Sequence, residues 1–157
     1  MAVLYTSLAP STGYGRASKV VGPGWAREVV CATAIISLAT TSIDNANDDV
    51  GLFWVPPGAV ICGVAVGVTD VDSGTAFVFD IGDVDDEDRI VAAATTGQAE
   101  GVTTALAYAG MLYKYSAATE IRYYCKTASN TPVAGTMKVA LFYFVDPEFS
   151  TTALTPA

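Results

Sequence analysis

Histidine is absent from the 157-residue sequence. This absence excludes nucleophilic catalysis by a Ser–His or Cys–His pair, and it removes the commonest metal ligand and the usual acid or base near neutral pH. The sequence also lacks a GxxxxGK[ST] or GxGxxG phosphate-binding loop; the nearest approach is Gly13-Tyr-Gly15, which does not follow a predicted strand. We therefore expect that the protein is not an enzyme and that it uses no cofactor.

Charge is scarce as well. Charged residues make up 15% of the chain, against about 25% in a typical soluble domain. Eight Lys and Arg oppose sixteen Asp and Glu, for a net charge of −8, and the basic residues are scattered singly. Nucleic acids and anionic membranes are recognised by clustered basic residues, so neither is expected as a partner. A surface with so few charges predicts that part of it is covered by other protein subunits.

Long apolar runs are missing too. The longest, residues 60–68, contains two glycines and is well short of the ~20 residues of a membrane span. The N-terminus has no basic segment followed by an apolar one, so we expect a protein that is made and used without secretion. Three cysteines at unrelated spacings predict small buried side chains in a reducing compartment.

What the sequence does contain is a series of short strand patterns. Residues 28–40 are rich in β-branched side chains, and residues 60–68 alternate bulky and small side chains. Turn residues around Asp72 predict a hairpin leading into a strand that contains Phe77 and Phe79. Further strands are predicted at residues 52–55, 102–107 and 112–115, and residues 120–127 and 137–145 predict a C-terminal hairpin.

One acidic segment, residues 83–88, precedes an alanine-rich run that ends at Gly97. This order predicts a short helix over residues 87–96 that begins after a solvated loop. The segment offers oxygen ligands for a cation, but it does not match the EF-hand spacing, so no metal site is predicted. Asp80 interrupts an apolar strand, and we interpret it as a hydrogen-bonded carboxylate at a sheet edge rather than a catalytic acid.

Many short strands and a single helix predict an all-β fold, an antiparallel β-sandwich of jelly-roll-like type. Glycine and proline punctuate residues 1–27, which predicts an extended N-terminal arm; residues 28–146 form the sandwich domain and residues 147–157 a C-terminal tail. Large aromatic side chains on such segments can anchor in a neighbour's pocket. The predicted partner-binding residues are therefore Tyr5, Tyr14, Trp25 and Phe149.

Residues 54–144, roughly three-fifths of the chain, resemble a family of tailed-bacteriophage virion structural proteins. The resemblance is carried by the runs VPPGA at 55–59, DVDSGTA at 70–76, DIG at 80–82, TGQA at 96–99 and AGT at 134–136. In size and β-rich character the family is similar to head decoration (cement) proteins. The resemblance implies a homo-oligomer, most often a trimer, that is made in the host cytoplasm and binds the major capsid protein on the capsid exterior.

Two other functions fit the same residues. The protein could serve elsewhere in the virion, as a neck, tail or fibre-base component, which the strand and turn motifs do not distinguish from decoration. From a different class, a row of exposed aromatic residues would make it a carbohydrate-binding module. The sequence does not say which of its two Trp, eight Tyr and six Phe residues are exposed.

Overall fold

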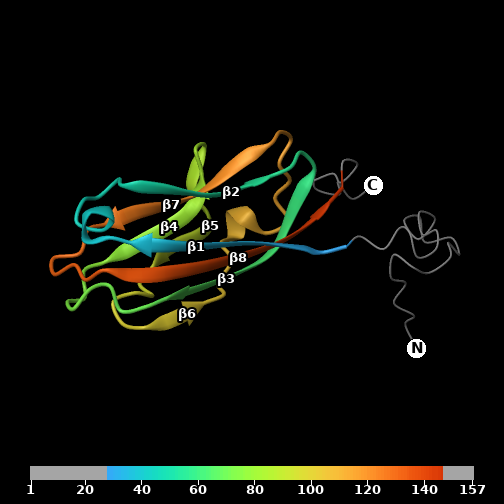
Figure 1. The fold of residues 1–157 in the computed structure, drawn as a ribbon. Coiled ribbons are helices and arrows are strands. Elements are labelled where there is room, and N and C mark those ends of the chain that lie inside the picture. The colour runs from blue at the N-terminus through green and yellow to red at the C-terminus, as the bar shows by residue number, and fades with distance from the viewer. Residues whose placement is uncertain (1–27, 147–157) are drawn as a thin grey trace, which may run out of the picture.

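The computed structural model describes residues 28–146, which form eight strands in two antiparallel sheets (Figure 1). Sheet A has the order β1-β8-β3-β6 and sheet B the order β2-β7-β4-β5. The strands are β1 (Val30–Leu38), β2 (Asp49–Val55), β3 (Ala59–Val68), β4 (Val78–Asp83), β5 (Asp86–Ala94), β6 (Gly101–Thr103), β7 (Thr119–Thr127) and β8 (Gly135–Val145). Within residues 28–146, the helical segments are two 3-10 turns, η3 (Thr40–Ser42) and η4 (Tyr108–Gly110).

The strands pair in a nested pattern: β1 with β8, β2 with β7, β3 with β6, and β4 with β5. Such a chain behaves as one long hairpin that has been wrapped around a sandwich, which is the jelly-roll topology. The predicted all-β, jelly-roll-like sandwich is therefore confirmed.

The core lies between the sheets. Alternate residues of each strand point inward. Sheet A contributes Ile61, Val66, Val139 and Leu141, and sheet B contributes Phe79, Ile81, Ile121 and Tyr123; all are almost fully buried. The rings of Phe79 and Tyr123 pack with their centroids 6.0 Å apart. The two predicted faces of residues 60–68 are confirmed over residues 64–68, where the valines are buried and the small residues between them are partly exposed. They are wrong before that point, because a register irregularity between Ile61 and Gly63 places Ile61 in the core and leaves Cys62 half-buried.

The predicted helix over residues 87–96 is wrong. These residues belong mostly to β5, which pairs with β4 along its length and buries Ile90 and Val91. The chain reverses at Asp83, whose carboxylate accepts hydrogen bonds from the backbone N–H groups of Asp85 and Asp86. The acids that resemble a helix start therefore form a tight hairpin turn, and cross-strand pairing with β4 overrides the helix signals.

The two predicted hairpins are also wrong. β7 and β8 alternate as expected, but β7 lies in sheet B and β8 in sheet A. Likewise β3 and β4, joined through the turn at Asp72, belong to different sheets. Alternation reports which face of a strand is buried and not which strand lies beside it, so a connection that crosses between sheets has the same pattern as a hairpin.

Two short predicted strands are only partly present. Residues 102–107 contribute β6, which ends at Thr103. Residues 112–115 form no named strand, but they run beside the start of β3 through a bridge between Val60 and Lys114 and a hydrogen bond from Leu112 N–H to the Ile61 carbonyl.

Candidate functional site

The four residues that the sequence nominates for partner binding, Tyr5, Tyr14, Trp25 and Phe149, lie outside the described residues. Their role stays a prediction. The sandwich itself, however, presents surfaces whose composition differs sharply from one side to another.

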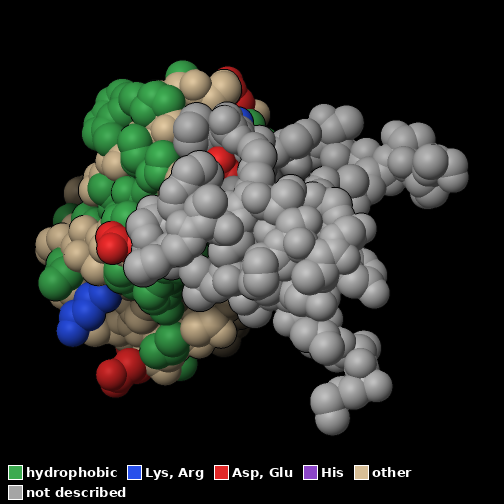
Figure 2. Space-filling view, turned by 90° about the vertical axis from the view of Figure 1, so that its right-hand side faces the viewer, with side chains coloured by type: hydrophobic (Ala, Val, Ile, Leu, Met, Phe, Trp, Pro, Cys, Tyr) green, Lys and Arg blue, Asp and Glu red, His purple; other side chains and the backbone are tan. Residues whose placement is uncertain are grey.

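The first is one end of the sandwich, which we call the terminal end. Here β1 begins, β2 ends, β3 begins and β8 ends, so the segments 1–27 and 147–157 both attach to the domain at this end (Figure 1). Four exposed apolar residues lie at this end: Val29, Val30, Trp54 and Val145. Trp54 lies opposite Glu120 on the outer face of sheet B, whereas the other three belong to β1, its flank and β8 on the sheet A side. Figure 2 looks at this end and shows hydrophobic side chains making up much of the described surface, with few charged ones between them.

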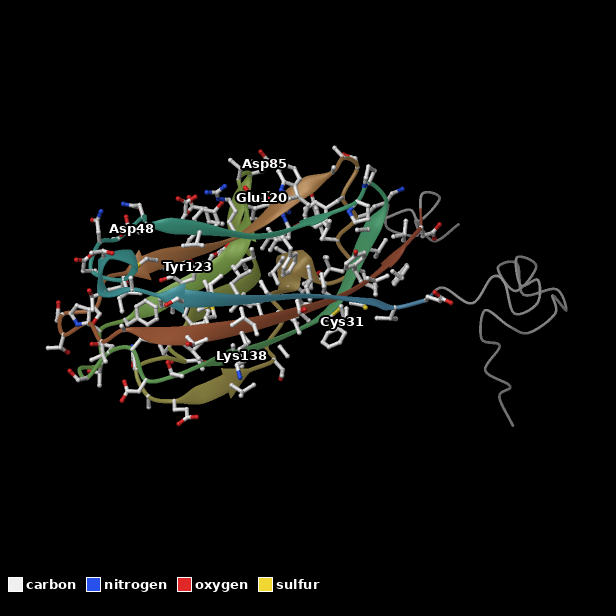
Figure 3. All side chains as sticks on the ribbon, viewed as in Figure 1. Cys31, Asp48, Asp85, Glu120, Tyr123 and Lys138 are labelled. Carbon is white, nitrogen blue, oxygen red and sulfur yellow. The ribbon has the colours of Figure 1, made fainter. Side chains whose placement is uncertain are left out.

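The second surface is the outer face of sheet A. Its outward residues lie in rows across three strands: Cys31, Phe142 and Gly63 in one row, Thr33, Ala140 and Ala65 in the next, and Ile35, Lys138 and Gly67 in the third. Because Cys31 is exposed and Cys62 half-buried, the predicted burial of the cysteines is correct for Cys125 and wrong for the other two. Lys138 is the one charged side chain in these rows (Figure 3).

Because many of its residues are small, few side chains project far from this face. A Cβ atom added to Gly63 would lie 3.5 Å from Cδ2 of Phe142, so the Phe142 ring lies beside the space that a larger side chain would fill. An apolar surface of low relief can pack closely against another protein, whereas a surface of long charged side chains resists dehydration.

The outer face of sheet B has the opposite character, because it carries the paired charges. Arg122 forms ion pairs with Asp49, at 2.5 Å, and with Glu120. Lys126 pairs with Asp80 at 3.0 Å, and this hydrogen bond raises the pKa of Lys126. The outer face of sheet B therefore has the character of a solvated surface, and the outer face of sheet A that of a candidate contact surface.

Asp80 is a buried carboxylate, but it does not lie at a sheet edge as predicted, because β4 lies between β7 and β5. Besides Lys126, it accepts a hydrogen bond of 2.5 Å from the backbone N–H of Ala93, which has a positive φ of 49°. Asp80 thus stabilises the irregular backbone of β5 at Ala93. This contact confirms its interpretation as a hydrogen-bonded structural residue.

A second buried carboxylate, Asp72, lies at the end of the sandwich opposite the terminal end. Its oxygens accept hydrogen bonds from the N–H groups of Gly74, Ala76 and Phe77 and from the hydroxyls of Ser129 and Thr131. Burial alone would raise the pKa of Asp72, but these donors hold it well below its usual range. Asp72 therefore ties together the two connections that cross between the sheets, rather than closing the simple hairpin that the sequence predicts.

The third buried carboxylate, Asp83, corrects the prediction that residues 83–88 form a wholly solvated loop. It accepts hydrogen bonds from Arg89 Nε at 2.6 Å and from the Tyr115 hydroxyl at 2.9 Å. The guanidinium of Arg89 lies over the ring of Tyr113, 3.9 Å from its centroid. Burial, together with the Asp83 charge, raises the pKa of Tyr115, so this hydroxyl remains a donor and anchors the loop after η4 to the β4–β5 hairpin.

In each of these clusters the carboxylate oxygens accept hydrogen bonds from donors of the protein itself. The hydroxyls of Ser129, Thr131 and Tyr115 are among these donors and belong to the same structural networks. Within residues 28–146, no three Cys, Asp or Glu side chains gather in a way that would hold a metal ion. Over the same residues, no helix has the length and apolar composition of a membrane span.

Sequence reasoning missed two exposed aromatic residues. Trp54 is 64% exposed and Tyr108, in η4, is 97% exposed. For Tyr108 a signal existed, because it falls between two predicted strands and is flanked by the small residues Ala107 and Ala109. For Trp54 there was none, since alternation over the four residues 52–55 does not say which face turns to solvent.

No protein-family model matches the chain, and no curated protein sequence matches it either. Solved structures do match. A chain of the cyanophage Pam1 capsid asymmetric unit aligns with a TM-score of 0.69 and 18% identity, over 93% of this chain and 100% of that one. A chain of the capsid of Ralstonia phage GP4 aligns with a TM-score of 0.63 and 26% identity, over 80% of this chain and 90% of that one.

A third match is a chain of the acid-stable capsid of the Helicobacter pylori bacteriophage KHP30, with a TM-score of 0.54 and 15% identity, over 78% of this chain and 94% of that one. At these identities the Pam1 and KHP30 chains show a shared fold, and the GP4 chain adds the higher sequence similarity. Together they confirm the resemblance to bacteriophage virion structural proteins that the strand and turn motifs of residues 54–144 predict.

Proposed function

We propose that this protein is a head decoration protein that binds the major capsid protein on the capsid exterior and stabilises the shell. The observation that carries the proposal is the terminal end. Both segments outside the described residues attach there, next to the exposed side chains of Trp54 and Val145. Attachment through this end would bury apolar side chains, each worth about 1.5–3 kcal/mol when fully removed from water.

The comparisons support a small separate subunit. The matched chains of the three phage capsids are covered over 90–100% of their length by this chain. They are therefore chains of similar size rather than one domain of a much larger shell protein. A separate chain of this size within a capsid is what a decoration protein would be.

The proposal has three further parts. Residues 1–27 and 147–157 serve as arms that extend the contact, with Tyr5, Tyr14, Trp25 and Phe149 as anchors. The subunits form a homotrimer, so that each attachment strengthens its neighbours. The protein has no catalytic role, in keeping with a chain that contains no histidine.

Binding to shells that lack this protein tests the proposal directly. Purified protein would be mixed with such shells and with free major capsid protein, and the bound fraction measured by co-sedimentation. We expect binding to shells, loss of binding in the double variant Trp54→Ser/Val145→Ser, and weaker binding after deletion of residues 1–20. Val133→Ser is the matched control, because Val133 and Val145 are each 45% exposed but Val133 lies in the loop beside Asp72, at the other end.

Unchanged occupancy in both the double variant and the deletion would contradict attachment through the terminal end. Localisation of the protein on virions by electron microscopy separates decoration from a neck, tail or fibre-base position. Labelling confined to one vertex or to the tail would favour those alternatives.

Carbohydrate binding is a second candidate, favoured by the exposure of Trp54 and Tyr108. Exposed aromatic rings can stack on sugar faces. Glycan-array binding that is lost in Tyr108→Ala, with shell binding unchanged, would support this second function.

A further inference from the structure

The two sheets have four edge strands, and three of them carry features that discourage pairing with another chain. β5 contains four charged residues within Asp86–Arg89, and β6 is three residues long. β2 contains Asp49 and has a register irregularity after Gly51. Charges, short length and bulges are the devices that natural proteins use to protect an exposed edge.

β1 has none of these devices. Its nine residues, VCATAIISL, include no charged residue and no proline, and its pairing with β8 runs without a register irregularity. Among residues 28–146, β8 is the strand that β1 pairs with. β2 of sheet B lies near β1 but forms no ladder with it, so the backbone groups on the other edge of β1 have no strand partner within these residues. Ile35, in the middle of β1, is 72% exposed.

We propose that β1 pairs antiparallel with β1 of a second copy of this chain, which joins the two four-stranded sheets into one sheet of eight strands. The partner is argued from charge and symmetry. Each copy carries a net charge of −8, so contact between two copies is favoured where neither brings charge, and β1 is the uncharged edge. A two-fold axis makes the same strand both donor and acceptor of the new backbone hydrogen bonds.

The register that pairs all nine residues places Ala34 on the two-fold axis. Thr33 then lies opposite Ile35 of the second copy, and Cys31 lies opposite Ser37. Thr33 and Ile35 are outward residues of β1, and β-branched pairs of this kind stabilise neighbouring strands. The contact also makes the outer faces of the two A sheets continuous. It does not depend on the proposed capsid role, and it would form in the purified protein.

The experiment is a measurement of mass by sedimentation velocity over a range of concentrations, on the full chain and on two variants changed at the same positions. Thr33→Lys/Ile35→Lys places like charges directly opposite each other in both cross-strand pairs. Thr33→Lys/Ile35→Glu places opposite charges there. Both positions are exposed, so each variant should stay folded. Because position 35 lies opposite Lys138 of β8 in the same chain, thermal unfolding should show Thr33→Lys/Ile35→Lys to be slightly less stable than Thr33→Lys/Ile35→Glu, and mass is compared at a temperature where both are folded.

We expect the mass of the unchanged protein to double with increasing concentration, from monomer to dimer or from a smaller oligomer to a pair of that oligomer. The Lys/Lys variant should have half that mass and a dimer Kd raised by ~10-fold or more, and the Lys/Glu variant should regain the dimer. A wild-type protein with no two-fold step at high concentration would overturn the proposal. So would equal association of the two variants.

A cross-link tests the register without altering charge. In Ser37→Cys, oxidation should join the introduced thiol at position 37 of one copy to the native Cys31 of the other, and the product should be a dimer on a non-reducing gel. The added change Cys31→Ser should abolish this product. Dimer formation that is the same with and without Cys31 would rule out the proposed register, and absence of any cross-linked dimer in Ser37→Cys would rule out the pairing. Failure of shell binding would leave both results unaffected.

Discussion

Asp72 accepts a hydrogen bond of 2.6 Å from the hydroxyl of Ser129, a residue 57 positions further along the chain. Asp72 lies in the connection from β3 to β4, and Ser129 lies in the connection from β7 to β8. Both connections cross from one sheet to the other. This one contact therefore joins the two sheets at the end of the sandwich that lies away from the chain termini.

Replacement of Asp72 should destabilise the domain strongly. In Asp72→Ala, the three backbone N–H groups that donate hydrogen bonds to the Asp72 carboxylate lose their acceptor. We expect the free energy of unfolding to fall by about 3–5 kcal/mol, and by less in Asp72→Asn, since the hydroxyls of Ser129 and Thr131 can rotate to accept. Chemical denaturation measures both. Asp70→Asn is the control, because Asp70 is exposed, and a change beyond about 0.5 kcal/mol there would point to a general effect of the turn.

The same carboxylate predicts the pH dependence of stability. The pKa of Asp72 is held below its usual range in the folded protein, so between that pKa and the unfolded value of about 3.9 the unfolded chain binds more protons. The contribution of Asp72 is therefore complete above pH ~5 and is lost progressively as the pH falls below ~4. Denaturation at a series of pH values should show a flatter acid limb in Asp72→Asn. Parallel curves for the two proteins would contradict the assignment.

Replacement by alanine should destabilise the protein strongly at Gly82 and only slightly at Gly63. A Cβ atom on Gly82 would overlap the backbone oxygen of Asp86, which cannot move without opening the β4–β5 hairpin. On Gly63 the nearest atom is a ring carbon of Phe142, at an ordinary contact distance of 3.5 Å. We expect Gly82→Ala to cost about 3 kcal/mol or more and Gly63→Ala less than about 1 kcal/mol. Similar melting temperatures for the two variants would show that the hairpin is less tightly packed.

Ala93 is expected to be a position where glycine stabilises. Its φ of 49° lies in the left-handed region, which disfavours a residue with a Cβ atom. Ala93→Gly should raise the free energy of unfolding by up to ~1 kcal/mol, whereas Ala94→Gly, one position along in the same strand, should lower it. Thermal unfolding of the two variants tests this prediction. A lower stability in both would indicate that β5 runs regularly through Ala93.

Loss of the exposed aromatic side chains should leave the fold intact. Trp54→Ala and Tyr108→Ala each remove a side chain that is mostly in water, so the expected change in stability is within about 0.5 kcal/mol. Phe79→Ala removes a fully buried ring of the core and should cost about 3–5 kcal/mol. A large loss in either exposed variant would mean that its ring is covered by another part of the chain.

The sequence by itself determined that the domain is an all-β sandwich, where most of its strands lie, and, for most strands, which face is buried. β1, β3, β7 and β8 coincide closely with predicted segments. Their alternating side chains are a local property, since one face of each strand must be buried whichever strand lies beside it. The absence of histidine is equally readable in the sequence, and it excludes Ser–His and Cys–His nucleophile pairs.

Only the tertiary structure decided which strands are neighbours. The loops after β3 and β7 resemble hairpin turns in sequence, yet they cross between the sheets, and the helix-like run after Asp83 becomes a strand because β4 offers it backbone partners. The exposure of Trp54 and the unprotected edge of β1 follow from the same arrangement. Outside the β4–β5 hairpin, strand pairing joins residues far apart in the chain, and its free energy comes from contacts between strands that the pattern of a single strand does not contain.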